Sequence, residues 1–184
     1  MQKPPRLLQN MSLQEKVNKS ILFSPWRMDY VTSPTKGENI FISKQASSND
    51  RKSLILFRGN TSFILMNLYP YNNGHLLIAP YDKYNDISKL DFNIFSEIIY
   101  LVQASIEILK IELKAEGFNV GFNMGKSAGA AIDEHLHLHI VPRWTGDSNF
   151  MPIVGQTKVI VQGLLDTYDL LKPKFDKVTP FEKI

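Results

Sequence analysis

Short apolar or alternating segments recur along the chain and predict β-strands. They lie at residues 53–58, 61–67, 75–79, 118–124 and 134–141. Gly59-Asn60 and the Pro-, Asn- and Gly-containing stretch 69–74 separate the first three segments. Because such residues favour tight turns, we expect these three strands to form an antiparallel meander.

A helical spacing of apolar residues follows the third strand. Residues 88–91 resemble a capping box, and apolar side chains then recur at intervals of three and four. These are Phe92, Phe95, Ile98 or Ile99, Val102, Ile106, Leu109 and Leu113. The pattern predicts a helix of about 25 residues and roughly 40 Å that ends at Gly117 and crosses the back of a sheet. Residues 157–171 suggest a second helix.

This order of strands and helices predicts an α+β domain with a mainly antiparallel sheet. The chain has 184 residues, a length that fits one domain with a full core. Residues 1–23 are predicted to form a polar arm, and residues 37–52, rich in Ser and Asn, a loop. We therefore expect a single domain over residues 24–184, including a C-terminal tail.

Charge and composition restrict the function classes. The net charge of +3 is mild, and the lysines crowd the chain ends rather than forming a basic stripe with interleaved aromatic residues, so a nucleic-acid partner is not expected. No run of about 18 apolar residues predicts a membrane span, and a cytoplasmic protein is the default expectation. The absence of cysteine excludes disulfides and thiolate metal ligands.

The densest chemical signal is the segment 134–141, which holds three of the four histidines of the chain. His135, His137 and His139 alternate with Leu136, Leu138 and Ile140. In an extended segment, residues two apart share a face, so the three imidazoles should face a cleft or solvent while the apolar residues pack on the core. Partial desolvation and mutual repulsion favour neutral imidazole near pH 7, and neutral imidazole is a nucleophile.

Two nucleotide or hydrolase motifs are matched only formally by the preceding loop. Residues 125–129 fit the serine-nucleophile pattern G-x-S-x-G, and residues 121–127 are one residue short of a P-loop. Neither has the helix that should follow. The loop 125–133 remains a candidate anion-binding nest with Asn123, Lys126 and Ser127 available, or a plain glycine-containing connection.

Zinc is the main chemical alternative for the histidines, because two histidines two apart on a strand can share a metal. Three rings pointing the same way would span about 13 Å, which one ion cannot bridge without distortion. We therefore expect no metal site. A purely structural role is a further alternative, above all for His75.

These residues match a known family. The sequence His-Leu-His-Leu-His-Ile-Val at 135–141 resembles the histidine triad signature, and residues 67–80 resemble the upstream nucleoside-binding hairpin of the same family. Asn123 with residues 125–129 resembles its phosphate loop. Residues 24–30 and 142–150 are similar to the bacterial diadenosine tetraphosphate phosphorylase branch.

The resemblance implies a five-stranded sheet with two helices, a homodimer, and nucleotidyl transfer through a covalent histidine intermediate. His137 would attack the α-phosphorus, and His135 would support and orient His137. His139 would contact the phosphate, and His75 would lie beside the triad. Asn67 would bind ribose hydroxyls. The remaining expected substrate-binding residues are Asn123, Gly125, Lys126, Ser127, Gly129, Arg143 and Trp144. No cofactor is expected in the protein, although Mg²⁺ can accompany the substrate phosphates.

Three positions depart from the family pattern. Asn39-Ile-Phe-Ile42 stands where many members have C-x-x-C, and Tyr84 where a histidine often follows. The structural zinc of those members is therefore not expected here. Ala131 replaces a common serine of the phosphate loop, removing one hydroxyl donor.

The sequence therefore predicts an enzyme that cleaves dinucleoside polyphosphates through nucleotidyl-His137. Whether water or phosphate accepts the nucleotidyl group is left open at this stage. The alternative is a nucleotide-binding or sensing protein on the same fold without catalysis.

Overall fold

The structure, a computed structural model, describes residues 39–130, 132–147 and 162–182. These residues belong to one compact unit formed by residues 33–148 and 159–184. A second group, residues 1–32 and 149–158, lies outside the described residues. The predicted arm 1–23 and its boundary with the domain fall there and stay predictions.

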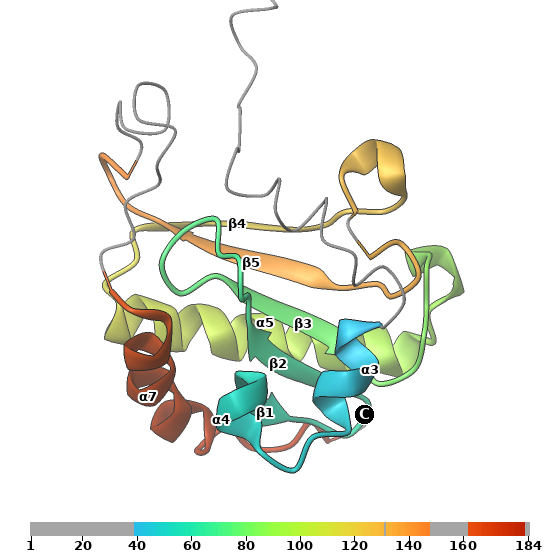
Figure 1. Cartoon of the computed structure of the whole chain (residues 1–184), viewed down its shortest axis with the longest axis horizontal. Helices are drawn as coiled ribbons and strands as arrows, with labels where there is room; N and C mark the ends of the chain where they lie inside the picture. The colour runs from blue at the N-terminus through green and yellow to red at the C-terminus, as the bar shows by residue number, and fades with distance from the viewer. Residues whose placement is uncertain (1–38, 131, 148–161, 183–184) are drawn as a thin grey trace, which may run out of the picture. The chain divides into compact units, whose positions relative to one another are not determined.

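The compact unit is built on a five-stranded sheet (Figure 1). The strands are β1 (Ile55–Arg58), β2 (Ser62–Met66), β3 (Leu76–Pro80), β4 (Gly117–Phe122) and β5 (Leu138–Arg143). Their order is β1-β2-β3-β5-β4, and every neighbouring pair is antiparallel. The predicted α+β class and the meander of the first three strands are confirmed.

The histidine segment is less regular than predicted. Strand β5 begins at Leu138, so His135 and His137 precede the strand and only His139 lies within it. The prediction of a strand from residue 134 is therefore wrong at its N-terminal end. His139 lies opposite Leu77 of β3 and Gly121 of β4.

The long helix is α5 (Phe92–Glu112), of 21 residues. Its N-cap is Asp91, whose carboxylate accepts from the Asn93 N–H, whereas the predicted capping box is replaced by the 3₁₀ turn η3 (Ile87–Lys89). The helix ends before Lys114, which has a left-handed φ of 54°. Gly117 begins β4 instead of ending the helix, so this predicted boundary is wrong.

The second predicted helix is α7 (Leu164–Phe175); residues 157–161 of the prediction lie outside the described residues. Two shorter helices, α3 (Ile40–Gln45) and α4 (Asp50–Ser53), occupy the stretch predicted as a loop. Their N-caps are Asn39 and Asn49, whose side chains accept from backbone N–H groups of the first turn. In the described part of the chain, no helix is long and apolar enough to cross a membrane.

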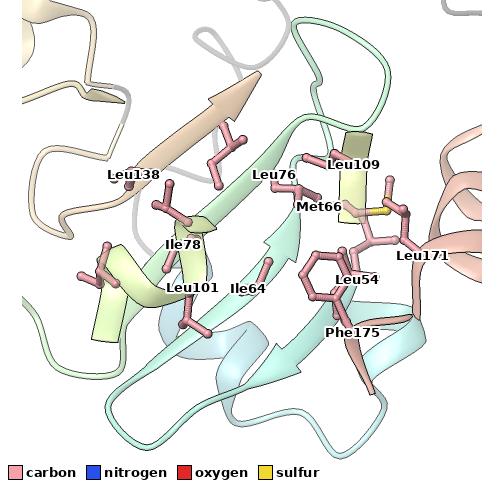
Figure 2. Packing of buried hydrophobic residues seen from close by; sticks show 14 of the residues in the cluster. Leu54, Ile64, Met66, Leu76, Ile78, Leu101, Leu109, Leu138, Leu171 and Phe175 are labelled. Carbon is pink, nitrogen blue, oxygen red and sulfur yellow. The ribbon is translucent and has the colours of Figure 1, made fainter. Parts of the chain in front are cut away.

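The alternation of side chains gives the sheet two apolar faces. Leu76 and Ile78 of β3 point to the face covered by α5 and α7, where the larger core cluster forms (Figure 2). Leu77 and Ala79 point to the opposite face, where Phe41 of α3 packs. Leu138 and Ile140 belong to the first face, so His139 between them belongs to the second.

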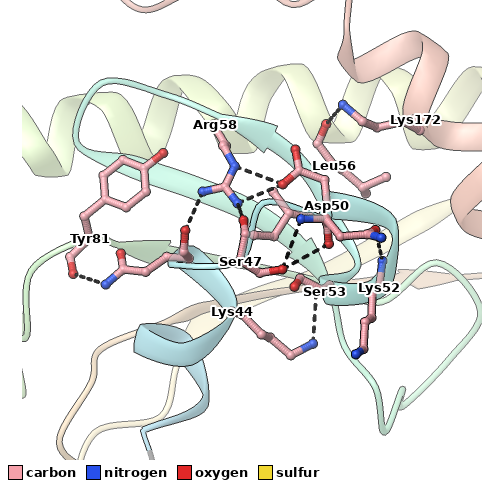
Figure 3. Close-up of polar contacts among 12 residues, drawn as sticks. Lys44, Ser47, Asp50, Lys52, Ser53, Leu56, Arg58, Tyr81 and Lys172 are labelled. Carbon is pink, nitrogen blue, oxygen red and sulfur yellow. Dashed lines mark hydrogen bonds and ion pairs between the residues drawn. The ribbon is translucent and has the colours of Figure 1, made fainter.

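Polar contacts hold α3 and α4 to the sheet (Figure 3). Arg58 of β1 donates to the Gln45 and Ser47 carbonyls and pairs with Asp50 at 2.8 Å. Lys44 Nζ donates to the Ser53 carbonyl at 3.0 Å, and burial lowers the pKa of this amine. The short segment before β1 is therefore fixed against the second face.

Candidate active site

All four histidines of the chain gather at one place on the second face. His139 projects from β5, His75 directly precedes β3, and His135 and His137 lie on the segment that enters β5. The ring centroids of His137 and His139 are 4.9 Å apart, and those of His75 and His139 are 5.2 Å apart. The predicted clustering of the histidines is therefore present in the structure.

The imidazoles are buried, with exposed fractions of 1% for His75, 0% for His135, 7% for His137 and 9% for His139. The prediction that the rings face a cleft or solvent overstated their exposure. Phe41 explains part of the difference, because its ring centroid lies 4.9 Å from the centroids of both His135 and His137.

Backbone carbonyls fix the protons of two of the rings. His137 Nδ1 is 2.8 Å from the His135 carbonyl oxygen, and His135 Nε2 is 2.8 Å from the Pro80 carbonyl oxygen. Since a carbonyl only accepts, His137 carries its proton on Nδ1 and His135 on Nε2. The lone pair of neutral His137 is therefore on Nε2. Within the described residues, Nε2 of His137 makes no hydrogen bond, and this atom is not fully buried.

The N–H of Tyr71 fixes the proton positions on the other two rings, His75 and His139. Tyr71 N–H donates to His75 Nδ1 at 3.0 Å, which must then be unprotonated. His75 consequently has its proton on Nε2 and donates to His139 Nδ1 at 3.0 Å. Neutral His139 in turn carries its proton on Nε2. The four rings thus form an ordered set of tautomers in which His137 has its lone pair on Nε2 and His139 carries its proton on a fully buried Nε2.

Burial also sets the charge of the reactive ring. Desolvation lowers the pKa of His137 below its ordinary value of 6.5, opposed by the hydrogen bond to the His135 carbonyl. Desolvation likewise lowers the pKa of His135. In both rings burial therefore favours the neutral form, the direction expected from the sequence pattern.

The glycine loop begins beside the histidines, because Phe122 at the end of β4 pairs with Leu138 at the start of β5. Gly125 and Gly129 have φ of 77° and 83°, and flank the 3₁₀ turn η4 (Lys126–Ala128). A Cβ added at either glycine would meet no atom within 4 Å, so these glycines are required by backbone conformation and not by crowding. Among the described residues, no hydrogen bond takes up the N–H groups of Gly125, Lys126 or Ser127.

Other predicted binding residues have different surroundings. Asn67 accepts from Tyr69 N–H through Oδ1, and its Nδ2 lies 3.3 Å from His75 Nδ1, so it stands beside the histidines. Lys126 lies 3.7 Å from Asp133 and Asn123 is half-buried at the start of the loop.

Arg143 and Trp144 lie at the other end of β5 from His139. Arg143 is four positions along the strand from His139, which corresponds to about 13 Å. Arg143 makes a two-point contact with Asp147 at 2.6 and 2.8 Å, and Trp144 donates to the Lys114 carbonyl at 2.9 Å. The structure thus gives both side chains structural contacts, and their predicted role in substrate binding stays a prediction.

Two contributors were absent from the sequence prediction. Phe41 packs on the triad and the Tyr71 N–H orders it. The sequence could have predicted the helix that carries Phe41, since Asn39 is a good N-cap before the apolar run Ile40-Phe41-Ile42. No side-chain pattern could reveal the Tyr71 contact, because it is made by the backbone.

The fold and the four-histidine cluster define a histidine triad protein. The sequence profile of the HIT domain matches residues 48–146, and the chain belongs to this family. It is 39% identical over 158 residues to the AP-4-A phosphorylase of Mycobacterium tuberculosis, which covers 82% of this chain and 81% of that relative. It is 31% identical over 93 residues to the bis(5'-adenosyl)-triphosphatase of Dictyostelium discoideum, covering 50% of this chain and 62% of the relative.

Solved structures show the same fold. A Zn-bound histidine triad family protein from Mycobacterium smegmatis superposes with a TM-score of 0.58 at 20% identity, covering 74% of this chain and 89% of the other. In the part of this chain that the structure describes, no group of three His, Cys, Asp or Glu side chains is placed to hold a metal ion.

Proposed function

We propose that this protein cleaves dinucleoside polyphosphates such as diadenosine tetraphosphate through a nucleotidyl-His137 intermediate. One observation carries the proposal: the Nδ1–H of His137 is committed to the His135 carbonyl, which leaves the Nε2 lone pair as the nucleophile. The names of the relatives with 39% and 31% identity support the substrate class.

In the first displacement, Nε2 forms a bond to the α-phosphorus while the bond from that phosphorus to the bridging oxygen breaks. The electron pair leaves with the nucleoside polyphosphate. His137 keeps its proton on Nδ1, so the ring becomes cationic, and the His135 carbonyl stabilises that charge. No base is needed to activate the nucleophile, because the ring is already neutral.

The surrounding donors match the charge that develops on the phosphate oxygens. His139 lies beside His137 with its Nε2 fully buried, so its predicted contact to the phosphate stays a prediction. The loop 125–129 has backbone N–H groups of the kind that form anion nests. Lys126 adds a positive field that attracts a polyanion. Asn67, Asn123 and Ser127 remain the proposed polar contacts to ribose and phosphate, and Mg²⁺ can arrive with the substrate.

In the second displacement an acceptor oxygen attacks the phosphorus and restores neutral His137. The relative named AP-4-A phosphorylase supports phosphate as this acceptor. Diadenosine tetraphosphate and phosphate would then give ATP and ADP, whereas water as acceptor would give ATP and AMP.

We also propose that the protein is a cytoplasmic homodimer. Strand β4 is an edge strand paired only with β5 among the described strands, and Asn119, Val120 and Gly121 are exposed on it. An edge of this kind can pair with a second copy.

The test is incubation with diadenosine tetraphosphate, with and without inorganic phosphate, for the wild-type protein and His137→Asn. We expect ADP only when phosphate is added, and a loss of turnover on the order of 10³-fold or more in the variant with nucleotide binding retained. An active variant would contradict the assigned nucleophile. Tight nucleotide binding by the wild type without turnover would favour the non-catalytic alternative.

A further inference from the structure

Phe41 is buried between the sheet and two histidines. Its ring is 0% exposed, and its centroid lies 4.9 Å from those of His135 and His137, with interplanar angles of 40° and 38°. On its other side it meets Phe63 at 6.5 Å in an edge-on arrangement. One aromatic side chain from α3 thus contacts the ring of His137 and the ring of His135, the residue whose backbone carbonyl accepts from His137 Nδ1–H.

The segment carrying Phe41 is fixed more firmly than a loop would be. Asn39 Oδ1 accepts from the N–H groups of Phe41 and Ile42. At the other end of α3, Gln45 Nε2 donates to the Tyr81 carbonyl at 3.2 Å, and Arg58 donates to the Gln45 carbonyl at 2.8 Å. Because the first turn of the helix is capped by Asn39 and its C-terminal end is bonded to the sheet, Phe41 cannot move away from the histidines without breaking these contacts.

This contact has two physical consequences for His137. The aromatic ring limits the orientations that the imidazole can adopt, so that Nδ1 stays on the His135 carbonyl. It also excludes water from one side of the ring, which disfavours the charged form. Desolvation is the largest cause of the lowered pKa of His137.

We propose that Phe41 is a positioning residue that keeps His137 correctly oriented and uncharged for attack. The inference rests on the proposed function but can fail separately from it. Among the described residues, the titratable rings of His135 and His139 lie next to His137, and Asp82 and Lys83 act on His135. On α3 itself, Lys44 is directed to the Ser53 carbonyl.

The test compares Phe41→Leu and Phe41→Met with the matched control Phe63→Leu. Phe63 is equally buried in the same cluster. Its ring packs against the rings of Phe41 and Tyr81, so the substitution removes a buried aromatic ring of the same size next to Phe41. The ring pKa of His137 is measured by NMR in the free protein, and kcat and KM are measured against pH with diadenosine tetraphosphate and phosphate.

We expect the Phe41 variants to raise the pKa of His137, since a smaller or more flexible side chain shields less of the ring from water, and to move the acid limb of kcat to higher pH. Above that limb kcat should remain lower by on the order of tenfold through lost orientation, with KM little changed. Phe63→Leu should leave the limb in place.

An unchanged pKa of His137 in both folded Phe41 variants would overturn the inference, as would an equal shift in Phe63→Leu. The NMR measurement needs no turnover, so it decides the role of Phe41 even if diadenosine tetraphosphate is not cleaved. Should Phe41→Leu fail to fold, Phe41→Met supplies the same comparison.

Discussion

At the level of single residues, the site depends on where four protons lie. Two are placed by carbonyl oxygens of His135 and Pro80, and two follow from the Tyr71 N–H. A histidine in the other tautomer would present a donor where the chemistry needs a lone pair. The backbone around the cluster therefore contributes as much to the proposed reactivity as the histidines themselves.

This arrangement predicts the tautomers directly. With four histidines in the chain, the ring nitrogens can be assigned by ¹⁵N NMR. We expect His137 protonated on Nδ1, and His75, His135 and His139 on Nε2. In His75→Gln, an amide can still donate to His139 Nδ1, so His139 should keep its tautomer, whereas His75→Ala should release it. A wild-type His137 protonated on Nε2 would refute the assignment.

The residue pattern of the histidine segment predicted this cluster only in part. Alternation with leucines placed His139 on the face opposite Leu138 and Ile140, as the structure confirms. The pattern could not predict that β5 begins at Leu138, because strand pairing depends on β3 and β4 and not on local alternation. Nor could it predict the burial of the rings, which depends on Phe41 from a segment 94 residues before His135 in the chain.

At the level of elements, the presence of the long periodic helix and of the five strands was predicted, whereas the two short helices were not. The 21-residue helix α5 has a clear apolar repeat, whereas α3 and α4 have six and four residues, too few for a periodic signal. Tertiary contacts with Arg58 hold them in place. The only local signals were the N-cap residues Asn39 and Asn49, which also occur in ordinary turns.

Helix α5 is joined to the sheet by a buried carboxylate. Glu97 is 1% exposed and accepts from the N–H groups of Asn60 and Thr61, each at 2.7 Å, and from the Thr61 hydroxyl. Gly59 leaves room for it, since a Cβ there would lie 2.6 Å from Glu97 Oε1. The β1–β2 turn is therefore shaped around this side chain.

We expect Glu97→Ala to lower the free energy of unfolding by about 2–4 kcal/mol, because two partly buried N–H groups and the Thr61 hydroxyl lose a charged acceptor. Glu107→Ala, at an exposed position of the same helix, should change it by less than about 0.5 kcal/mol. Urea denaturation of both variants measures the difference. Equal stabilities would mean that the turn does not depend on Glu97.

At the level of the whole molecule, the class of fold was predictable from the order of elements, and the family from the histidine signature.

The proposed dimer also concerns the whole molecule. Val120 is 43% exposed on the edge strand, so we expect Val120→Lys to weaken self-association by tenfold or more, about 1.4 kcal/mol. Leu165→Lys, on α7 near β1 at the opposite edge, is the control. Sedimentation of both variants as stable dimers would argue against β4 as the interface.

The proposed reaction depends on a covalent bond between His137 Nε2 and the α-phosphorus. Mixing excess protein with diadenosine tetraphosphate labelled at the α-phosphate, without added phosphate, and quenching in alkali tests it most directly, because phosphohistidine bonds survive there. We expect label on the wild-type protein at His137, discharged to ADP by added phosphate, and none on His137→Asn. Turnover without any labelled protein, or label retained by His137→Asn, would contradict it.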